Sequence, residues 1–316
     1  MARPTNMRSL LILAAVAAFI LLSPCAMWHA ICKAETGKFH VNIGFSTKAF
    51  VNVPREDIRV AVRILSQKVA RNTVGSANSQ IYDSLADIER DLKSKQLDAV
   101  ALTPEDFLAL RPRIPLDPIM VTATSKGHEV ELLLLTRKDS RISAFRELKN
   151  RTIAIPARVV QYGNMYFTWI ETLLMREGFP NLETFFSSVN EAKTPSRALM
   201  QVFFRQADAC VVTDQVFDLA TELNPQIGKE LTVLTRVDKL AGGIIVFRND
   251  LQEDRKQKLR EALRTLHEGQ EGRQLFVLFQ LNRLVPYRPE YLRATQLFFE
   301  DYHDLDRRKN LRRKRM

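Results

Sequence analysis

One short pattern occurs twice in the chain and limits the folds open to it more than any other feature. Residues 98–107 read DAVALTPEDF and residues 208–217 read DACVVTDQVF, so an Asp, four apolar residues, a Thr and a later Phe recur in the same order. A short apolar run that is entered from a polar residue and left through Thr is typical of a buried parallel strand ending at a loop. The repeat therefore predicts two similar α/β units.

A second repeat accompanies the first. Residues 132–139 read LLLLTRKD and residues 244–250 read IIVFRND, about one unit further along the chain. A chain of 316 residues also exceeds one typical domain. We therefore expect an α/β fold of two lobes, with one ligand cleft where the ends of the parallel strands face each other.

The first 34 residues have the pattern of a secretory signal peptide. Arg3 and Arg8 precede an apolar run from Leu10 to Leu22, and the segment closes at Ala34. The run is short for a membrane span, so we expect export to the periplasm with cleavage near Ala34. A retained N-terminal membrane anchor is the alternative.

The net charge of +11 belongs mostly to the two ends of the chain. Without the basic residues of segment 1–34 it falls to +8, and the tail 307–316 holds seven Lys and Arg and no acid. The body between them is close to +1, which argues against a nucleic-acid-binding surface. We expect a solvated, disordered tail, with attraction to an anionic membrane surface as the alternative.

The motifs of catalysis and cofactor binding are missing from the sequence. GxxxxGK(S/T), GxGxxG and GxSxG do not occur, and the His residues after segment 1–34 are dispersed. Cys210 stands alone in an apolar run and has no obvious partner base. We therefore expect no enzymatic activity, no cofactor and no metal site.

Alternating and helical apolar periods indicate the order of elements. The pattern predicts lobe 1 as residues 35–135 plus 238–306 and lobe 2 as residues 136–237. The predicted strands are 38–45, 99–102, 119–123, 132–136, 152–155, 209–212, 231–235 and 244–247, and the main predicted helices are 55–71, 83–97, 195–206, one from Asn164 and those from Asp254 onward.

Polar residues at the ends of the predicted strands are the candidates for ligand binding. Right-handed crossovers place these ends at one edge of each sheet, where polar side chains from both lobes would surround a small ligand. The segment from Pro156 to Gly163 joins a strand to a helix, and free backbone N–H groups there suit an anion. Turn formation and helix capping are the alternative roles, above all for Ser196 and Asp214. The candidates are Ser46, Thr47, Thr103, Gln161, Tyr162, Asn164, Thr194, Ser196 and Asp214.

Several segments together resemble the phosphate- and phosphonate-type periplasmic solute-binding proteins of ABC importers. The resemblance covers most of residues 38–252 and implies a type II periplasmic-binding-protein fold, in which two α/β lobes joined by a two-strand hinge close over a ligand. On this sequence the hinge would pass near Thr136 and Val237. The segments are IGFSTKAF (43–50), IYDSLADIERDLKSKQLDAVALTP (81–104), LLLLTRKDSRISAFRELKNRTIAIP (132–156), DACVVTDQ (208–215) and GGIIVFRNDL (242–251).

The sequence departs from this family's pattern where ligand specificity is expected. A Ser-Thr-Ser-Gly loop of members that bind tetrahedral oxyanions is matched by residues 160–163, VQYG, and a His-Glu pair by Lys193-Thr194. A Tyr often found at the first-lobe strand end is matched by Leu102, whereas Asp214 fits the pattern. An oxyanion stripped of water needs replacement donors, such as backbone N–H groups and Gln161, or the ligand is a different and less charged one.

The main hypothesis is therefore an exported, monomeric solute-binding protein. It would capture a small polar or anionic solute between its lobes and deliver it to an ABC permease or report it to a membrane sensor. The alternative is a periplasmic sensing or interaction module with a diverged pocket, which residues 160–162 motivate. An enzyme built on the same fold is a third hypothesis, for which the sequence offers no convincing base or nucleophile.

Overall fold

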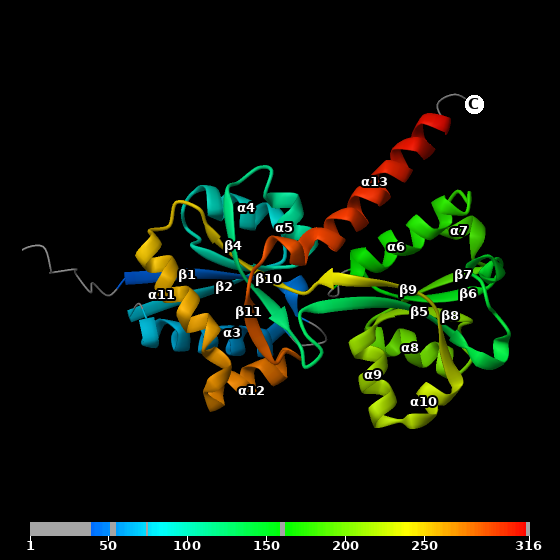
Figure 1. Cartoon of the computed structure of the whole chain (residues 1–316), viewed down its shortest axis with the longest axis horizontal. Helices are drawn as coiled ribbons and strands as arrows, with labels where there is room; N and C mark the ends of the chain where they lie inside the picture. The colour runs from blue at the N-terminus through cyan, green and yellow to red at the C-terminus, as the bar shows by residue number, and fades with distance from the viewer. Residues whose placement is uncertain (1–38, 51–54, 74, 159–161, 314–316) are drawn as a thin grey trace, which may run out of the picture. The chain divides into compact units, whose positions relative to one another are not determined.

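The computed structural model describes residues 39–50, 55–73, 75–158 and 162–313. The predicted signal peptide and Gln161 lie outside these residues. Within them the chain forms two mixed β-sheets flanked by helices, which is the two-lobed α/β fold that the repeat predicts (Figure 1). In this part of the chain, no helix has the length and apolar character needed to span a membrane.

The first sheet belongs to lobe 1 and has six strands in the order β11-β4-β10-β3-β1-β2. β1 and β3 are parallel, whereas β10 runs antiparallel to β3 and β4. One face packs on α4 and α5 through Val100 and Leu102, and the other packs on α3 and α12 through Phe45. The elements are β1 (Phe39–Ser46), η1 (Thr47–Ala49), α3 (Arg55–Thr73), β2 (Gly75–Tyr82), α4 (Leu85–Lys93), β3 (Ala99–Leu102), α5 (Pro104–Leu110), β4 (Leu116–Ala123), β10 (Ile244–Arg248), α11 (Glu253–Arg264), η4 (Leu266–Glu268), α12 (Gln270–Leu278), β11 (Arg283–Pro286) and η5 (Pro289–Leu292).

The second sheet belongs to lobe 2 and has five strands in the order β7-β6-β8-β5-β9. β6 is parallel to β7 and β8, and β5 runs antiparallel to β8 and β9. Figure 1 shows α6 and α7 over one face and α8, α9 and α10 over the other. The elements are β5 (Glu129–Arg137), η2 (Lys138–Ser140), η3 (Phe145–Leu148), β6 (Thr152–Pro156), α6 (Gly163–Arg176), α7 (Leu182–Phe185), β7 (Ser188–Ala192), α8 (Pro195–Phe203), β8 (Ala209–Thr213), α9 (Asp214–Leu223), α10 (Pro225–Glu230) and β9 (Leu231–Ala241).

The repeated Asp has the same structural role in both lobes. The backbone N–H of Asp98 donates to the carbonyl of Asn42 on β1, and its Oδ2 accepts from the Asn42 backbone N–H, both at 2.9 Å. Asp208 makes the same two bonds with Thr152 on β6, at 2.9 Å and 2.8 Å. Each Asp therefore ties the beginning of the central strand to its parallel neighbour, which confirms the repeat as a structural unit.

The chain passes between the two sheets at residues 124–128 and 242–243. β5 and β9 pair along their whole length in the second sheet, from Glu129 opposite Ala241 to Arg137 opposite Leu231. The hinge predicted near Thr136 and Val237 is therefore wrong, because both of those positions lie inside paired strands. The limits of the lobes as predicted from the sequence otherwise stay a prediction.

The crossing at residues 242–243 requires a close approach to β4. A Cβ atom at Gly242 would lie 2.6 Å from Oγ1 of Thr122. A side chain at this position would push the crossing segment away from β4, which explains why glycine follows β9 directly.

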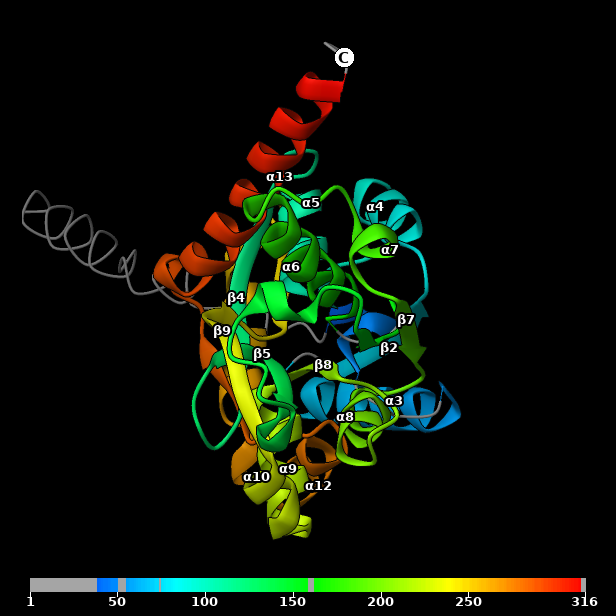
Figure 2. The same cartoon turned by 90° about the vertical axis from the view of Figure 1, so that its right-hand side faces the viewer.

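The C-terminal helix α13 (Arg293–Arg313) follows η5 of lobe 1 but packs on lobe 2 (Figure 2). Phe298 belongs to the buried core of that lobe, and Tyr302 Oη donates to Oε2 of Glu171 on α6 at 2.8 Å. Arg176 on α6 also pairs with Asp301 at 2.8 Å. The expected disordered tail is therefore wrong up to Arg313, because helix α13 continues through the basic residues.

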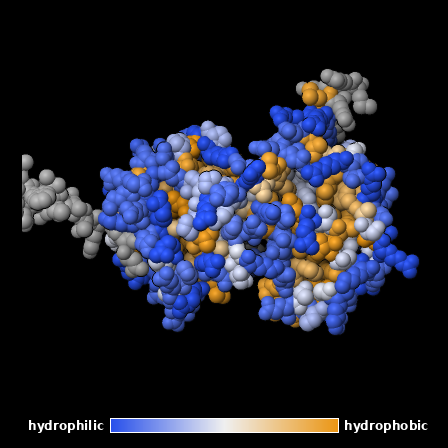
Figure 3. Space-filling view, in the orientation of Figure 1, coloured by the Kyte–Doolittle hydropathy of each residue, from blue (hydrophilic) through white to orange (hydrophobic). Residues whose placement is uncertain are grey.

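The apolar side chains that define the two cores are withdrawn from the surface. Leu132, Leu134 and Leu135 of β5 are fully buried. Figure 3 shows a mainly hydrophilic face in which apolar residues form small groups. The strand ends, rather than a large apolar surface, are therefore the natural place to look for a site.

Candidate functional site

Both central strands lead directly into a helix through the repeated Thr. Thr103 Oγ1 accepts a hydrogen bond from the Asp106 backbone N–H at 3.1 Å, and Thr213 Oγ1 accepts from Val216 N–H at 3.4 Å. Both hydroxyls are therefore helix caps, and both residues are buried. Because Thr103 Oγ1 only accepts in this cap, its O–H can still donate a hydrogen bond.

The end of β1 lies beside the end of β3. Phe45 is opposite Ala101 in the parallel pair, so Ser46 and Thr47 follow at the same sheet edge as Thr103. Ser46 is buried, and Thr47 Oγ1 donates to the carbonyl of Tyr82 at 3.3 Å. The predicted first-lobe candidates are thus brought together.

Lys48 connects this edge to helix α5. Its Nζ lies 3.7 Å from Oδ1 of Asp106 in the first turn of the helix. About a third of the Lys48 side chain is exposed, against 6% for Asp106. The ammonium group is therefore a cation placed beside the strand ends of lobe 1.

The second-lobe candidates lie at the beginning of α6. Tyr162 precedes the helix with a left-handed backbone (φ 58°), and Asn164 is in the first turn. Burial raises the pKa of Tyr162, and the negative charge of Asp214 raises it further. The phenol therefore keeps its proton at neutral pH and is available as a donor. Gln161 lies outside the described residues.

Asp214 is the first residue of α9 and is held on both sides. Its Oδ1 accepts from the Glu131 backbone N–H on β5 at 3.2 Å, and its Oδ2 lies 3.6 Å from Nζ of Lys126. Lys126 belongs to the segment that crosses between the sheets and also pairs with Asp218. The carboxylate thus joins α9 to β5 and to the crossing segment, and it lies where the helix dipole favours negative charge.

Thr194 and Ser196 stand at the beginning of α8, on the same edge of the second sheet. Thr194 Oγ1 accepts from the Arg197 backbone N–H at 3.2 Å, so it caps the helix. Ser196 follows Pro195 and is exposed. Their ligand-binding role stays a prediction, as it does for the other candidates.

Each copy of the repeat makes a hydrogen bond to the opposite lobe. Asn164 Nδ2 on α6 donates to Oε1 of Glu105 on α5 at 3.1 Å. Gln215 Nε2 on α9 donates to the carbonyl of Gln280, which precedes β11, at 2.9 Å. Glu105 and Gln215 occupy the same position in the two copies, two residues after the capping Thr. The first turn of each repeated helix therefore reaches the opposite lobe.

Glu105 is the site residue that sequence reasoning missed. Burial raises its pKa, the neighbouring Asp106 raises it further, and Lys48 and Arg158 oppose the shift. The sequence held one signal: Glu105 aligns with Gln215 when the two copies are superposed, so a charged residue in one copy corresponds to a neutral residue in the other. The side chain meets Asn164 only through the fold, which no pattern in the sequence shows.

The remaining charges near the site are balanced. The Arg158 guanidinium stacks 3.9 Å from the Phe167 ring centre and lies 3.6 Å from Oε1 of Glu171. Among the residues that the structure describes, no three His, Cys, Asp or Glu side chains form a group suited to a metal ion. The arrangement offers hydrogen-bond donors and acceptors around a sheet edge rather than a reactive pair.

Comparison with known proteins decides what kind of protein carries this site. A family model described as "ABC transporter, phosphonate, periplasmic substrate-binding protein" matches residues 54–292. The chain belongs to this family. The match begins just before α3 and ends with η5, so it includes the second sheet, both crossings and every strand of the first sheet except β1. The family consists of solute-binding proteins that deliver small anionic solutes to a membrane permease, and it is not a family of enzymes.

Solved structures show the same fold at low sequence identity. A protein from Xanthomonas citri (XAC2383, bound to chloride) has a TM-score of 0.63 at 13% identity, with 85% of this chain and 99% of that chain covered. A binding protein component of an ABC phosphonate transporter from Pseudomonas aeruginosa (PA3383) has a TM-score of 0.62 at 14% identity, covering 86% and 89%. PhnD1 from Prochlorococcus marinus, in complex with methylphosphonate, has a TM-score of 0.60 at 13% identity, covering 84% and 99%. No curated protein matches the chain significantly in sequence. The sensing alternative gains no support from these comparisons.

Proposed function

We propose that this phosphonate-family binding protein captures a small phosphonate-like solute where the strand ends of the two lobes face each other. The observation that carries the proposal is the hydrogen bond from Asn164 to Glu105, because it brings the first turn of α6 onto the first turn of α5. A ligand entering there would replace Glu105 as the acceptor of the Asn164 amide N–H. The predicted candidates Ser46, Thr47, Thr103, Gln161, Tyr162, Thr194, Ser196 and Asp214 would complete the contacts.

The donors available at this edge support an oxyanion as one part of the ligand. Free backbone N–H groups at the beginning of α6, the protonated phenol of Tyr162 and the ammonium of Lys48 are all groups that bind an anion. They are a different set from the Ser and Thr hydroxyls of the family pattern. The proposal is therefore a ligand of the same charge class held by different donors.

The acids at the same edge favour a ligand that also carries a donor. Glu105 and Asp214 both face the strand ends, and a purely anionic solute would be repelled by each of them. An ammonium or hydroxyl group on the ligand would instead satisfy one carboxylate. A small aminophosphonate fits both halves of this description better than inorganic phosphate does.

The proposal includes where the protein works and with what. We propose cleavage of a signal peptide near Ala34, a periplasmic monomer, delivery to an ABC permease and no nucleic-acid partner. The family is periplasmic, which supports the location. N-terminal sequencing of the exported protein and light scattering during gel filtration would test the cleavage and the monomeric state.

Isothermal titration calorimetry on ligand-free protein tests the site. The titrants are methylphosphonate, 2-aminoethylphosphonate, phosphite and methanesulfonate, and we expect the aminophosphonate to bind most tightly. Asn164→Ala should weaken it about tenfold, the loss of one hydrogen bond to a charged group. Asn310→Ala is the matched control, because Asn310 is exposed and bonds only Asp306 on its own helix.

Two results would count against the proposed site. If none of the four compounds binds wild-type protein, the solute is of another class. If Asn164→Ala and Asn310→Ala bind the aminophosphonate equally well, the ligand does not sit at the junction of α5 and α6.

A further inference from the structure

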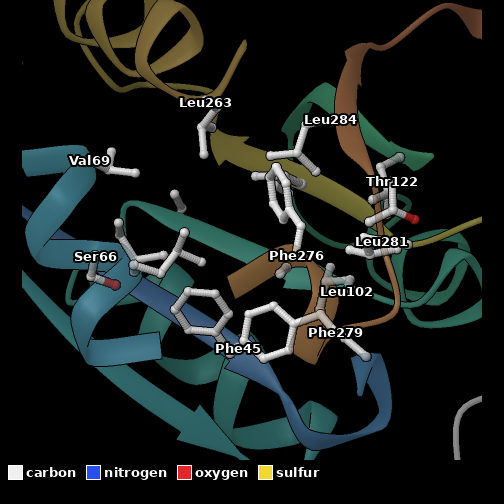
Figure 4. Close-up of a pocket in the computed structure, with 18 of the residues that line it drawn as sticks. Phe45, Ser66, Val69, Leu102, Thr122, Leu263, Phe276, Phe279, Leu281 and Leu284 are labelled. Carbon is white, nitrogen blue, oxygen red and sulfur yellow. The ribbon is translucent and has the colours of Figure 1, made fainter. Parts of the chain in front are cut away.

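Lobe 1 contains an apolar cavity, and none of the candidate residues of the strand-end site lines it. It lies between the sheet face formed by β1, β3 and β10 and the helices α3, α11 and α12, and Figure 4 shows the side chains around it. About 80 Å³ is open to the centre of a water-sized sphere. Its walls include Phe45, Leu65, Val69, Phe276 and Phe279.

The cavity arises from small residues on both sides of this layer. β3 presents Ala99 and Ala101, and Gly243 precedes β10. Helix α3 faces the cavity with Leu65, Ser66 and Val69, of which Ser66 is small. Close packing is the rule in protein interiors, so an unfilled space of this size is a feature of the lobe rather than a packing detail.

A buried hydroxyl opens onto the cavity and has no partner. Ser66, in the middle of α3, is 1% exposed, and its Oγ makes no hydrogen bond. In Figure 4 its oxygen is drawn toward Phe45, on the cavity side of the helix. A buried hydroxyl left without a partner destabilises the protein, and a hydrogen-bonding atom in the cavity would remove that cost.

The wall chemistry limits what the cavity can hold. None of the described residues around it carries a charge, so an ionised ligand would lose its hydration without compensation. One water needs roughly 10–15 Å³ by the same measure, so the space suits a compound of about six to eight heavy atoms. Because the walls are apolar except for Ser66 and Thr122, the compound needs an apolar body and one hydrogen-bonding atom.

We propose that this cavity is a second binding site, for a small neutral amphiphile of about the size of phenol. The ring or alkyl body contacts Phe45 and Phe279, and the polar atom bonds to Ser66. The site is separate from the one at the strand ends, so it stands or falls independently of the solute proposed there.

The test uses 4-fluorophenol and ¹⁹F NMR on the full chain. Wild type binds the probe. Ala101→Val fills the cavity and weakens binding at least tenfold, and Ser66→Ala keeps the space but weakens binding about fivefold, the loss of one neutral hydrogen bond. Fluorobenzene, which has no hydroxyl, binds wild type and Ser66→Ala alike. Asn164→Ala, in the solute site, binds 4-fluorophenol as wild type does.

Each contrary outcome overturns a defined part of the proposal. No binding to wild type at the solubility limit of the probe means that the cavity is not a ligand site. Equal binding by wild type and Ala101→Val shows that the probe binds outside the cavity. Equal binding by wild type and Ser66→Ala shows that the probe makes no hydrogen bond to Ser66. If Ala101→Val does not fold, as judged by circular dichroism, Val69→Ile fills the same space from the helix side.

Discussion

The two lobes share a strand-and-helix order but fill the space inside it differently. β1-α3-β2-α4-β3-α5 and β6-α6-β7-α8-β8-α9 correspond, with the same Asp bridge at one end of the central strand and the same Thr cap at the other. Yet α6 covers its sheet with Tyr166, Trp169 and Ile170, whereas α3 leaves a cavity. The two lobes therefore share the polar contacts at the strand ends, whereas the packing of apolar side chains between sheet and helix differs.

The Asp bridge gives the largest expected effect and the most direct way to break the symmetry. Asp98→Ala should lower the free energy of unfolding by about 3 kcal/mol. It leaves the Asn42 N–H without its acceptor, and it removes the carboxylate 3.4 Å from Arg248, whose side chain is only 14% exposed. Asp208→Ala should cost only about 1.5 kcal/mol, since its partner Arg151 is half exposed at 3.8 Å. Urea denaturation of both variants measures the difference.

Equal losses in the two variants would contradict this reading. They would mean that the strand-bridging hydrogen bond accounts for the whole effect and that the ion pair with Arg248 in lobe 1 adds nothing. Asp98→Asn is the control, because it keeps an acceptor for the Asn42 N–H but removes the charge opposite Arg248.

A reciprocal exchange on the central strands sharpens the comparison of the interiors. Val211 of β8 and Ala101 of β3 are corresponding positions, and Val211 is fully buried. Val211→Ala should cost about 2 kcal/mol through lost contacts and a new void. Ala101→Val should stabilise the protein by about 1 kcal/mol, because it fills space that is already empty. A loss of stability in Ala101→Val would show that the cavity is too narrow for two added methyl groups.

The sequence was enough to predict the elements that depend on local pattern. The repeated strands, the helices α3, α6 and α8, and the two-lobed class all followed from apolar periodicity and from the repeat. The crossing between the sheets did not, because β5 and β9 are long strands and periodicity says nothing about which sheet a strand joins. Helices after Asp254 were predicted, but the continuation of α13 through the basic tail was not, because a run of Lys and Arg is typical of disorder. Its packing on lobe 2 through Phe298 and Tyr302 depends on the fold.

The candidate site was predictable only in part, for a related reason. Strand-end residues are visible in the sequence, so Ser46, Thr47 and Thr103 could be grouped by topology. The pairing of Glu105 with Asn164 depends on how two lobes meet, which neither residue reveals alone. The sequence predicted Thr194 either as a helix cap or as a ligand contact. It could not separate the two roles, because both place Ser or Thr at the beginning of a helix.

Converting one copy of the repeat into the other gives the next, smaller effect. Glu105→Gln places in lobe 1 the residue found at Gln215 and keeps an acceptor for Asn164. The folded-state pKa of Glu105 is raised, so its stabilising contribution is complete below about pH 4.5 and is lost as pH rises through the folded pKa. At pH 7 the variant should therefore melt about 2 °C higher than wild type. The two should melt at the same temperature at pH 4, and a constant difference at both pH values would contradict the charge-based explanation.

The smallest effect concerns the attachment of α13 to α6, which has no counterpart in the repeat. Burial and the hydrogen bond to Glu171 raise the pKa of Tyr302 to about 12. Its stabilising contribution is complete below the unfolded pKa of about 10 and is lost as pH rises toward 12. Tyr302→Phe should cost about 0.5 kcal/mol at pH 8, because the hydrogen bond is partly exposed to solvent. The difference between the variant and wild type should shrink between pH 10 and 12, which urea denaturation at several pH values measures. A difference that stays constant over this range would show that Tyr302 stabilises α13 through its ring rather than through its hydroxyl.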